Sequence, residues 1–319
     1  MEPDTTDAWS DYWKGGRSAS CFEGPDTEVR LTRVWNEFVD SFRDGARFLD
    51  LATGNGAVVR ICAAHAHARG IGLHIDAVDA AAIDPVRYLA DPSPSIEGVR
   101  FQGNVKLENL PFPDSRYDAV ASQFGFEYAT EEQAVTETAR VLAAAGRLRL
   151  VLHAKEGKVS HDIGRRVERL RIALADDGPI TLVRTLVRAA AAGDAGALSR
   201  AASQLPAAVE TARRLVNEAP QDDAALYYSR EFLQLWNRRD RYWPADLRHS
   251  IEEGWTNANG VAIRQAQMLR VARSSEDMKR ISTRFSDAGL VVDRLRELRA
   301  ERRNMQIAWL LDAHKPSGS

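Results

Sequence analysis

Length, composition and charge exclude several classes of protein. With 319 residues, 44% of them hydrophobic and 28% charged, the chain is long enough for one large or two medium soluble domains. Its formal net charge of −2 offers no general attraction to nucleic acid or to a membrane, so neither is expected as a partner. Cys21 and Cys62 cannot form a disulfide framework, and there is no run of 18 apolar residues. The acidic N-terminus lacks the apolar core of a signal peptide, so we expect a cytoplasmic protein.

Strands and helices alternate in the first half of the chain. The apolar periodicity predicts helices within 5–24 and at 27–42, 57–67 and 131–144. Apolar and β-branched runs predict strands at 47–52, 73–78, 99–102 and 146–154, and within 116–126. Gly146 suits a C-cap of the fourth helix. This alternation indicates a parallel sheet covered by helices on both faces.

The pattern changes after residue 155. Residues 156 to about 288 are almost wholly helical in character, with an alanine-rich middle. Two strand-like pieces, 289–295 and 304–313, flank a charged turn and predict an antiparallel hairpin at the sheet edge. We therefore expect an α/β fold, a Rossmann-like doubly wound sheet with an antiparallel C-terminal hairpin strand and a large helical insert. The expected parts are an N-terminal helical segment at 1–45, the Rossmann-like domain at 46–155 and 263–319, and the insert at 156–262.

The segment FLDLATGNGAVV, residues 48–59, marks a ligand loop. Ligands of open α/β sheets bind outside the carboxyl ends of the strands, and this loop follows the first strand. Gly54 and Gly56 let the backbone approach a ligand, but Val59 stands where a dinucleotide fingerprint has a third glycine or alanine. Asp50 would repel a pyrophosphate and attract a cation.

Two further positions favour an adenosine. Asp79 ends the second strand, where an acid can accept hydrogen bonds from both ribose hydroxyls. Asn104 follows the third strand, where its amide could hold the adenine amino group and the next backbone N–H a ring nitrogen. S-adenosylmethionine is an adenosine with a positive charge and no phosphate, so it fits these features.

Residues 47–153 resemble class I S-adenosylmethionine-dependent methyltransferases, in the branch with the ubiquinone/menaquinone and small-molecule enzymes. The matching segments are the 50–56 loop, Asp79, GNVKLENLPFPDSRYDAVASQFGFEY and ARVLAAAGRLRLVLH, and the terminal hairpin matches the antiparallel seventh strand of the family. Asn104 replaces the commoner aspartate, and AAAG replaces the usual Gly-Gly before the fifth strand. The resemblance implies a methyltransferase without a metal, in which S-adenosyl-L-methionine is bound by Asp50, Ala52, Gly54, Asn55, Gly56, Asp79, Ala80, Asn104, Val105 and Gln123.

The expected reaction is in-line methyl transfer to an oxygen, nitrogen or carbon atom of a small metabolite or natural-product intermediate. His153 is the best candidate for a general base, with Glu127 and Tyr128 as weaker candidates; alternatively, His153 hydrogen-bonds a loop carbonyl. The motif of exocyclic-amine methylases is absent, since SQFGFEY follows the fourth strand. Two other functions stay open: a protein that binds the cofactor without methylating, and a nicotinamide-dependent oxidoreductase.

The helical insert and three side-chain groups allow two interpretations each. We predict a helical cap over the acceptor pocket, with 264–289 returning as the crossover helix; the alternative is a dimerisation arm in a homodimer. Trp9, Tyr12 and Trp13 either pack the N-terminal helix or close over a sulfonium. An arginine cluster forms either a solvated helix face or a carboxylate site: Arg165, Arg166, Arg169 and Arg171. An aromatic group is expected to be mostly core: Tyr227, Tyr228, Phe232, Trp236, Tyr242 and Trp243.

Overall fold

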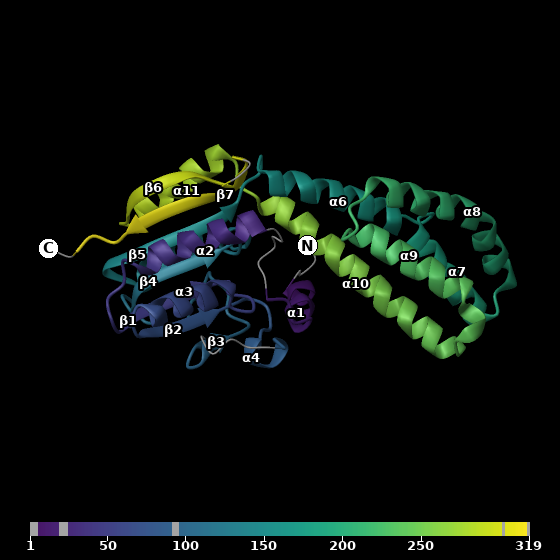
Figure 1. Cartoon of the computed structure of the whole chain (residues 1–319), viewed down its shortest axis with the longest axis horizontal. Coiled ribbons are helices and arrows are strands. Elements are labelled where there is room, and N and C mark those ends of the chain that lie inside the picture. The colour runs from purple at the N-terminus through teal and green to yellow at the C-terminus, as the bar shows by residue number, and fades with distance from the viewer. Residues whose placement is uncertain (1–5, 19–24, 91–95, 302–303, 318–319) are drawn as a thin grey trace. The chain divides into compact units, whose positions relative to one another are not determined.

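A mixed sheet forms the centre of the first part of the chain (Figure 1). The computed structural model describes residues 6–18, 25–90, 96–301 and 304–317. Within these ranges, seven strands lie in the order β3-β2-β1-β4-β5-β7-β6; β7 runs antiparallel to both of its neighbours, β5 and β6, and the other pairs are parallel. The strands are β1 Ala46–Leu51, β2 Leu73–Val78, β3 Arg100–Gln102, β4 Tyr117–Gln123, β5 Leu142–His153, β6 Val291–Arg299 and β7 Gln306–His314. The predicted doubly wound sheet with an antiparallel C-terminal hairpin strand and a large helical insert is therefore confirmed.

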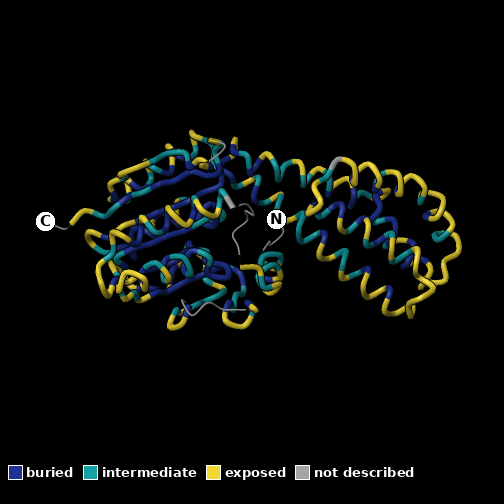
Figure 2. The backbone as a smooth tube through the Cα atoms, in the orientation of Figure 1, coloured by how far each residue is buried: buried dark blue, intermediate teal, exposed yellow. Residues whose placement is uncertain are grey.

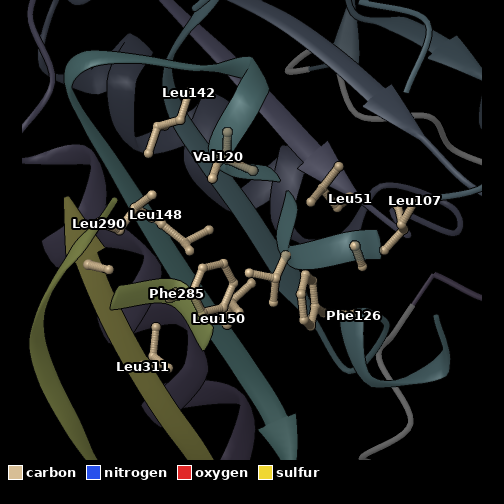
Figure 3. Packing of buried hydrophobic residues seen from close by; sticks show 14 of the residues in the cluster. Leu51, Leu107, Val120, Phe126, Leu142, Leu148, Leu150, Phe285, Leu290 and Leu311 are labelled. Atoms are coloured by element: carbon tan, nitrogen blue, oxygen red, sulfur yellow. The ribbon is translucent and has the colours of Figure 1, made fainter. Parts of the chain in front are cut away.

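Helices cover both faces of this sheet. Figure 1 shows α2 and α3 on the near face and α11 on the far face. The helices of this part are α1 Thr6–Lys14, α2 Pro25–Val39, α3 Ala57–Ala68, α4 Pro85–Tyr88, α5 Glu131–Val141 and α11 Ser275–Asp287. Figure 2 shows that the strands between the helix layers are largely buried. On the α5 and α11 face, Phe126, Leu150, Phe285 and Leu311 pack in one apolar cluster (Figure 3).

The predicted C-cap at Gly146 is wrong. Helix α5 ends at Val141, and its C-cap residue Leu142 is already extended, with φ −73° and ψ 127°. The ammonium of Lys315 donates to the carbonyls of Ala139 and Leu142 at 2.8 and 2.9 Å, and so satisfies the end of the helix. The first residues of β5 lie where the sequence predicts the last turn of the helix.

Two other boundaries differ from the sequence prediction. The expected crossover helix 264–289 is interrupted, because Ser274 and Asp277 form a capping box that starts α11 as a separate helix. Strand β6 continues to Arg299 through the predicted charged turn. The polar side chains of this stretch suit an edge strand, while Leu298 is fully buried.

The chain divides into two compact units, residues 1–161 with 268–319, and residues 162–267. The second unit is built from the helical insert: α6 Lys158–Leu174, α7 Pro179–Ala192, α8 Ala195–Glu218, α9 Ala224–Asn237 and α10 Pro244–Val271. It has its own apolar core, which includes Leu170, Ile180, Phe232 and Ile251. Within the described ranges, no helix combines the length and apolarity that a membrane crossing requires.

The side-chain groups predicted in the insert lie in two environments. The arginines of the 165–171 cluster pair with Asp162, Asp222, Asp223 and Glu168, so they bind acids of the insert itself. In the aromatic group, Phe232 is buried and Tyr228 and Trp236 are partly buried. Tyr227, Tyr242 and Trp243 are exposed, so the prediction of a mostly core aromatic group is wrong for half of its members.

Candidate functional site

The carboxyl ends of β1 and β4 carry strained backbone. Ala52 and Phe124 have φ values of 53° and 57°, in the left-handed region that residues with a Cβ rarely adopt. The two segments touch, since a Cβ on Gly125 would lie 2.3 Å from the Cβ of Ala52. Such strain costs about 1–3 kcal/mol per residue and clusters at ligand sites, so this edge of the sheet is the candidate site.

Asp79 connects two loops at this edge. One carboxylate oxygen accepts the N–H of Gly54 and the other accepts the N–H of Ala81, both at 2.8 Å. The carboxylate is buried, and burial raises its pKa to about 6 against the effect of these two hydrogen bonds. Asp79 therefore fixes the glycine loop after β1 to the loop after β2, which includes the half-buried Ala80.

Asp50 is the least solvated acid of the site. Its side chain lies in β1, and the residue is 1% exposed. Oδ2 accepts the hydroxyl of Thr53 at 2.6 Å, whereas the buried Oδ1 has no hydrogen-bond partner among the described residues. Burial, with a smaller effect from the negative charge of Asp79, raises the pKa of Asp50 to about 7, against the effect of the Thr53 hydrogen bond. A cationic group would stabilise this carboxylate, so Asp50 fits a positively charged ligand.

Helix α1 packs against the same loops. A Cβ at Gly54, where φ is 54°, would lie 2.3 Å from the indole of Trp13. The buried Asn55 donates through Nδ2 to the carbonyls of Trp13 and Arg17, both at 2.9 Å. Ser10 accepts the N–H of Ala82 at 3.0 Å. Gly54 thus makes room for Trp13, and Asn55 holds α1 in place.

The aromatic residues of α1 form one cluster. The ring of Trp9 lies 5.6 Å from Tyr12 and 6.2 Å from Trp13, and it also meets Tyr128 edge-on at 5.5 Å. These contacts extend from the glycine loop to the segment after β4. Cys21 lies outside the described residues.

The adenine side of the site differs from the sequence prediction. The backbone N–H of Val105, expected to bind a ring nitrogen, donates to the carbonyl of Asp79 at 2.9 Å. This donor is engaged within the protein, so its predicted role does not hold in this structure. The side chain of Asn104 is exposed, with φ 60°. Gln123 accepts the indole N–H of Trp35 at 2.7 Å, so its amide is fixed against α2.

His153 and Glu127 form a second buried group. His153 ends β5, and its Nδ1 lies 2.7 Å from Oε1 of Glu127 with both side chains fully buried. The ring of Phe124 lies 4.4 Å from the imidazole, and Tyr128 lies edge-on at 6.3 Å. The imidazole therefore bonds a carboxylate, and its two ring neighbours come from the end of β4 and the turn that follows.

Arg273 was not predicted as part of this group. Its N–H donates to the carbonyl of His153 at 2.8 Å, and its guanidinium donates to the carbonyl of Glu127 at 3.1 Å. The backbone N–H of Lys155 in turn donates to the carbonyl of Arg273 at 2.9 Å. The chain thus leaves for the insert and returns from it beside His153. No local sequence signal marks this pairing, because the partners lie far apart in the chain.

The fold and site define the class of protein. The strand order and the acid-bearing ends of β1 and β2 are those of a Rossmann-like nucleotide-binding domain. Residues 49–150 match the family model described as a methyltransferase domain. This part of the chain is therefore a class I S-adenosylmethionine-dependent methyltransferase domain, and S-adenosyl-L-methionine is the methyl donor of that family.

Known relatives match only part of the chain. It is 33% identical over 136 residues to the ubiquinone/menaquinone biosynthesis C-methyltransferase UbiE of Ectopseudomonas mendocina, covering 40% of this chain and 50% of that protein. It is 40% identical over 105 residues to the demethylmenaquinone methyltransferase of Thermus thermophilus, covering 32% and 44%. The chain thus spans about half the length of these relatives. The geranyl diphosphate C-methyltransferase structure from Streptomyces coelicolor A3(2) has 12% identity over 98% of both chains and a TM-score of 0.46, a likeness too low to support a conclusion.

Proposed function

We propose that this protein transfers the methyl group of S-adenosylmethionine to an oxygen, nitrogen or carbon atom of a small molecule. The observation that carries the proposal is the buried Oδ1 of Asp50 near the end of β1, which has no hydrogen-bond partner in the described part of the chain and lies inside the matched methyltransferase domain. A nicotinamide dinucleotide carries a negative pyrophosphate, which a second buried acid beside Asp79 would repel. The nicotinamide alternative is therefore not retained.

The cofactor would be held by residues of the 50–56 and 79–82 loops. Asp50 would pair with its cationic end, and Asp79 would accept from the ribose hydroxyls. The loop residues Ala52, Gly54, Asn55 and Gly56 would line the cofactor, with Trp13 packed on Gly54. Asn104 would reach the adenine through its exposed side chain, with Ala80 and Gln123 as walls. When bound, the cofactor supplies a methyl group on a cationic sulfur that leaves as the acceptor bond forms. The protein residues supply alignment and exclude water.

His153 would act on the acceptor as a general base. Its contact with Glu127 fixes the ring, and a carboxylate on Nδ1 stabilises the imidazolium that forms when the other ring nitrogen takes a proton. Tyr128 would line the same region rather than carry the proton. This step is needed only for an acceptor that is protonated before transfer.

We further propose that the helical insert determines the acceptor. Both ends of the insert connect beside His153, through the hydrogen bonds of Arg273 and Lys155. This connection supports a role next to the chemistry, as in the cap predicted from the sequence. Dimerisation through the insert is the competing role.

Calorimetry with S-adenosylmethionine, followed by a metabolite screen with a labelled methyl donor, tests the proposed function. Asp50→Asn is expected to weaken cofactor binding about tenfold or more, because a charge-assisted contact is lost. Asp293→Asn is the matched control, since this acid lies on β6 and pairs with His314. Equal affinities of the two variants would remove Asp50 from the site. Binding without turnover across a broad acceptor panel would instead favour a non-methylating protein.

A further inference from the structure

The connection between α9 and α10 presents an unusual surface. We call it the basic aromatic tip; it consists of Arg238, Arg239, Arg241, Tyr242, Trp243 and Arg248. Trp243 is 79% exposed and Tyr242 is 42% exposed. Figure 1 shows this connection at one end of the helical unit, where α9 turns into α10. Two neighbouring aromatic rings at the end of a unit are open to a partner.

The charge of the tip is positive although the chain as a whole is slightly negative. Residues 238–248 carry four arginines and two acids, Asp240 and Asp246, which gives a local charge of +2. None of the four arginines forms an ion pair with a described residue, whereas seven other arginines of the insert do. Instead, the guanidinium of Arg239 lies 4.6 Å from the ring of Trp236. The tip therefore has free positive charge for an anionic partner.

The surroundings of the tip add a place for an anionic group. Arg248 lines an open hollow of about 390 Å³ between the end of α7 and the start of α10, together with Glu252 and small alanine side chains. Arg188 also lines it but is paired with Glu252 at 2.5 Å. Arg248 is thus the unpaired cation at this hollow within the described part of the chain.

We propose that the basic aromatic tip docks on an anionic lipid bilayer. Tryptophan and tyrosine prefer the interface between headgroups and acyl chains, and arginine keeps its charged end among the headgroups while its stem contacts apolar surface. Positive side chains near an anionic leaflet add an attraction that salt weakens. A bilayer fits better than a folded acidic protein, since both rings are exposed side by side among arginines that form no ion pair with a described residue. The whole-chain charge, which predicted no membrane partner, does not describe this local surface.

Vesicle co-sedimentation of the full chain tests the proposal. We expect binding to vesicles of phosphatidylcholine with phosphatidylglycerol, little binding to pure phosphatidylcholine, and release by salt. Replacing both rings, Tyr242→Ala with Trp243→Ala, is expected to lower the partition constant about tenfold. Arg239→Gln with Arg241→Gln is expected to remove the preference for the anionic vesicles.

Tyr227→Ala is the matched control, because Tyr227 is an exposed ring of the same unit, 58% accessible, with Glu231 beside it. It should bind vesicles as the unchanged protein does, and all variants should keep cofactor affinity. The proposal is overturned if the full chain does not bind anionic vesicles, or if the Tyr242 and Trp243 variant binds like the control. Salt-sensitive binding to heparin or RNA that is indifferent to the two rings, without vesicle binding, would also overturn it in favour of a soluble polyanion.

Discussion

The Oε1 atom of Glu127 lies 2.7 Å from Nδ1 of His153 and also accepts the backbone N–H of His153 at 2.8 Å. One oxygen therefore holds both the ring and the main chain of the histidine, while Oε2 is buried without a partner among the described residues. This arrangement fixes which ring nitrogen faces the carboxylate. In the role we propose, the other ring nitrogen would take the proton of the acceptor.

His153→Ala is expected to keep cofactor affinity and lower turnover about 100-fold, because a general base typically contributes a factor of this order. Glu127→Gln should cost less, about tenfold, and should shift the acid limb of the kcat profile toward lower pH, because the imidazolium loses the carboxylate that stabilises it. A shifted pH profile for Glu127→Gln would show that Glu127 acts on the imidazole of His153, whereas a residue that only packs would leave the profile in place. A rate for His153→Ala equal to that of the unchanged protein between pH about 6 and about 9 would make His153 structural.

Asp79→Ala is expected to weaken S-adenosylmethionine binding by about 1–3 kcal/mol, through the lost ribose contact and the freed N–H groups of Gly54 and Ala81. Calorimetry measures the affinity, and thermal unfolding shows whether the variant is folded. Asp76, which bonds Arg100 on the neighbouring strand, offers a control acid in β2. A folded Asp79 variant with unchanged affinity would exclude this residue from the cofactor site.

Cofactor affinity should increase with pH between about 6 and about 8, because Asp50 must lose its proton to pair with a cation. The pKa of Asp50 is about 7 in the folded chain against 3.8 as its ordinary value. Between these values the folded state holds a proton that the unfolded state lacks, so the ligand-free protein loses stability as pH rises through this window. The shift in Tm on adding cofactor should therefore grow with pH. Asp50→Asn should flatten this dependence, and a flat profile for the unchanged protein would contradict the pairing.

The sheet and its glycine loop were predictable because their signals are local. Each signal lies within a short segment. Apolar runs predict the strands, and the acid at the end of β2 and the glycines after β1 predict a ligand site at the carboxyl ends of the strands. The nearness of Asp50 to Asp79 follows from parallel pairing, since Asp50 and Ala77 are partners in the register.

The remaining features depend on contacts between distant segments. The contact of Trp13 with Gly54 and that of Arg273 with His153 join residues far apart in sequence, so no periodicity reveals them. The end of α5 depends on Lys315 in the same way. The N–H of Val105, predicted to bind an adenine nitrogen, instead donates to the carbonyl of Asp79. This hydrogen bond depends on how the folded loops meet, so the sequence does not reveal it.

Gly54→Val should disturb both the loop and α1. A branched side chain at a left-handed φ of 54° is strained, and its Cβ would overlap the indole of Trp13. We expect cofactor affinity to fall about tenfold or more and the tryptophan fluorescence to change without added ligand. Gly193→Val is the control, because this left-handed glycine of the insert has no neighbour within 4 Å of an added Cβ. Normal cofactor binding by a folded Gly54 variant would show that the loop lies elsewhere.

Replacing residues 162–267 by a short linker separates the two roles of the insert. The remaining unit contains its own apolar cluster around Phe126, Leu150 and Phe285, so we expect it to fold and to bind S-adenosylmethionine. If the insert selects the acceptor, the shortened chain loses methyl transfer while its oligomeric state, measured by light scattering, stays as in the full chain. If the insert is a dimerisation arm, the shortened chain becomes monomeric and still methylates the same acceptor. Thermal unfolding with and without cofactor provides the check on folding, because a ligand that binds only the folded state raises Tm.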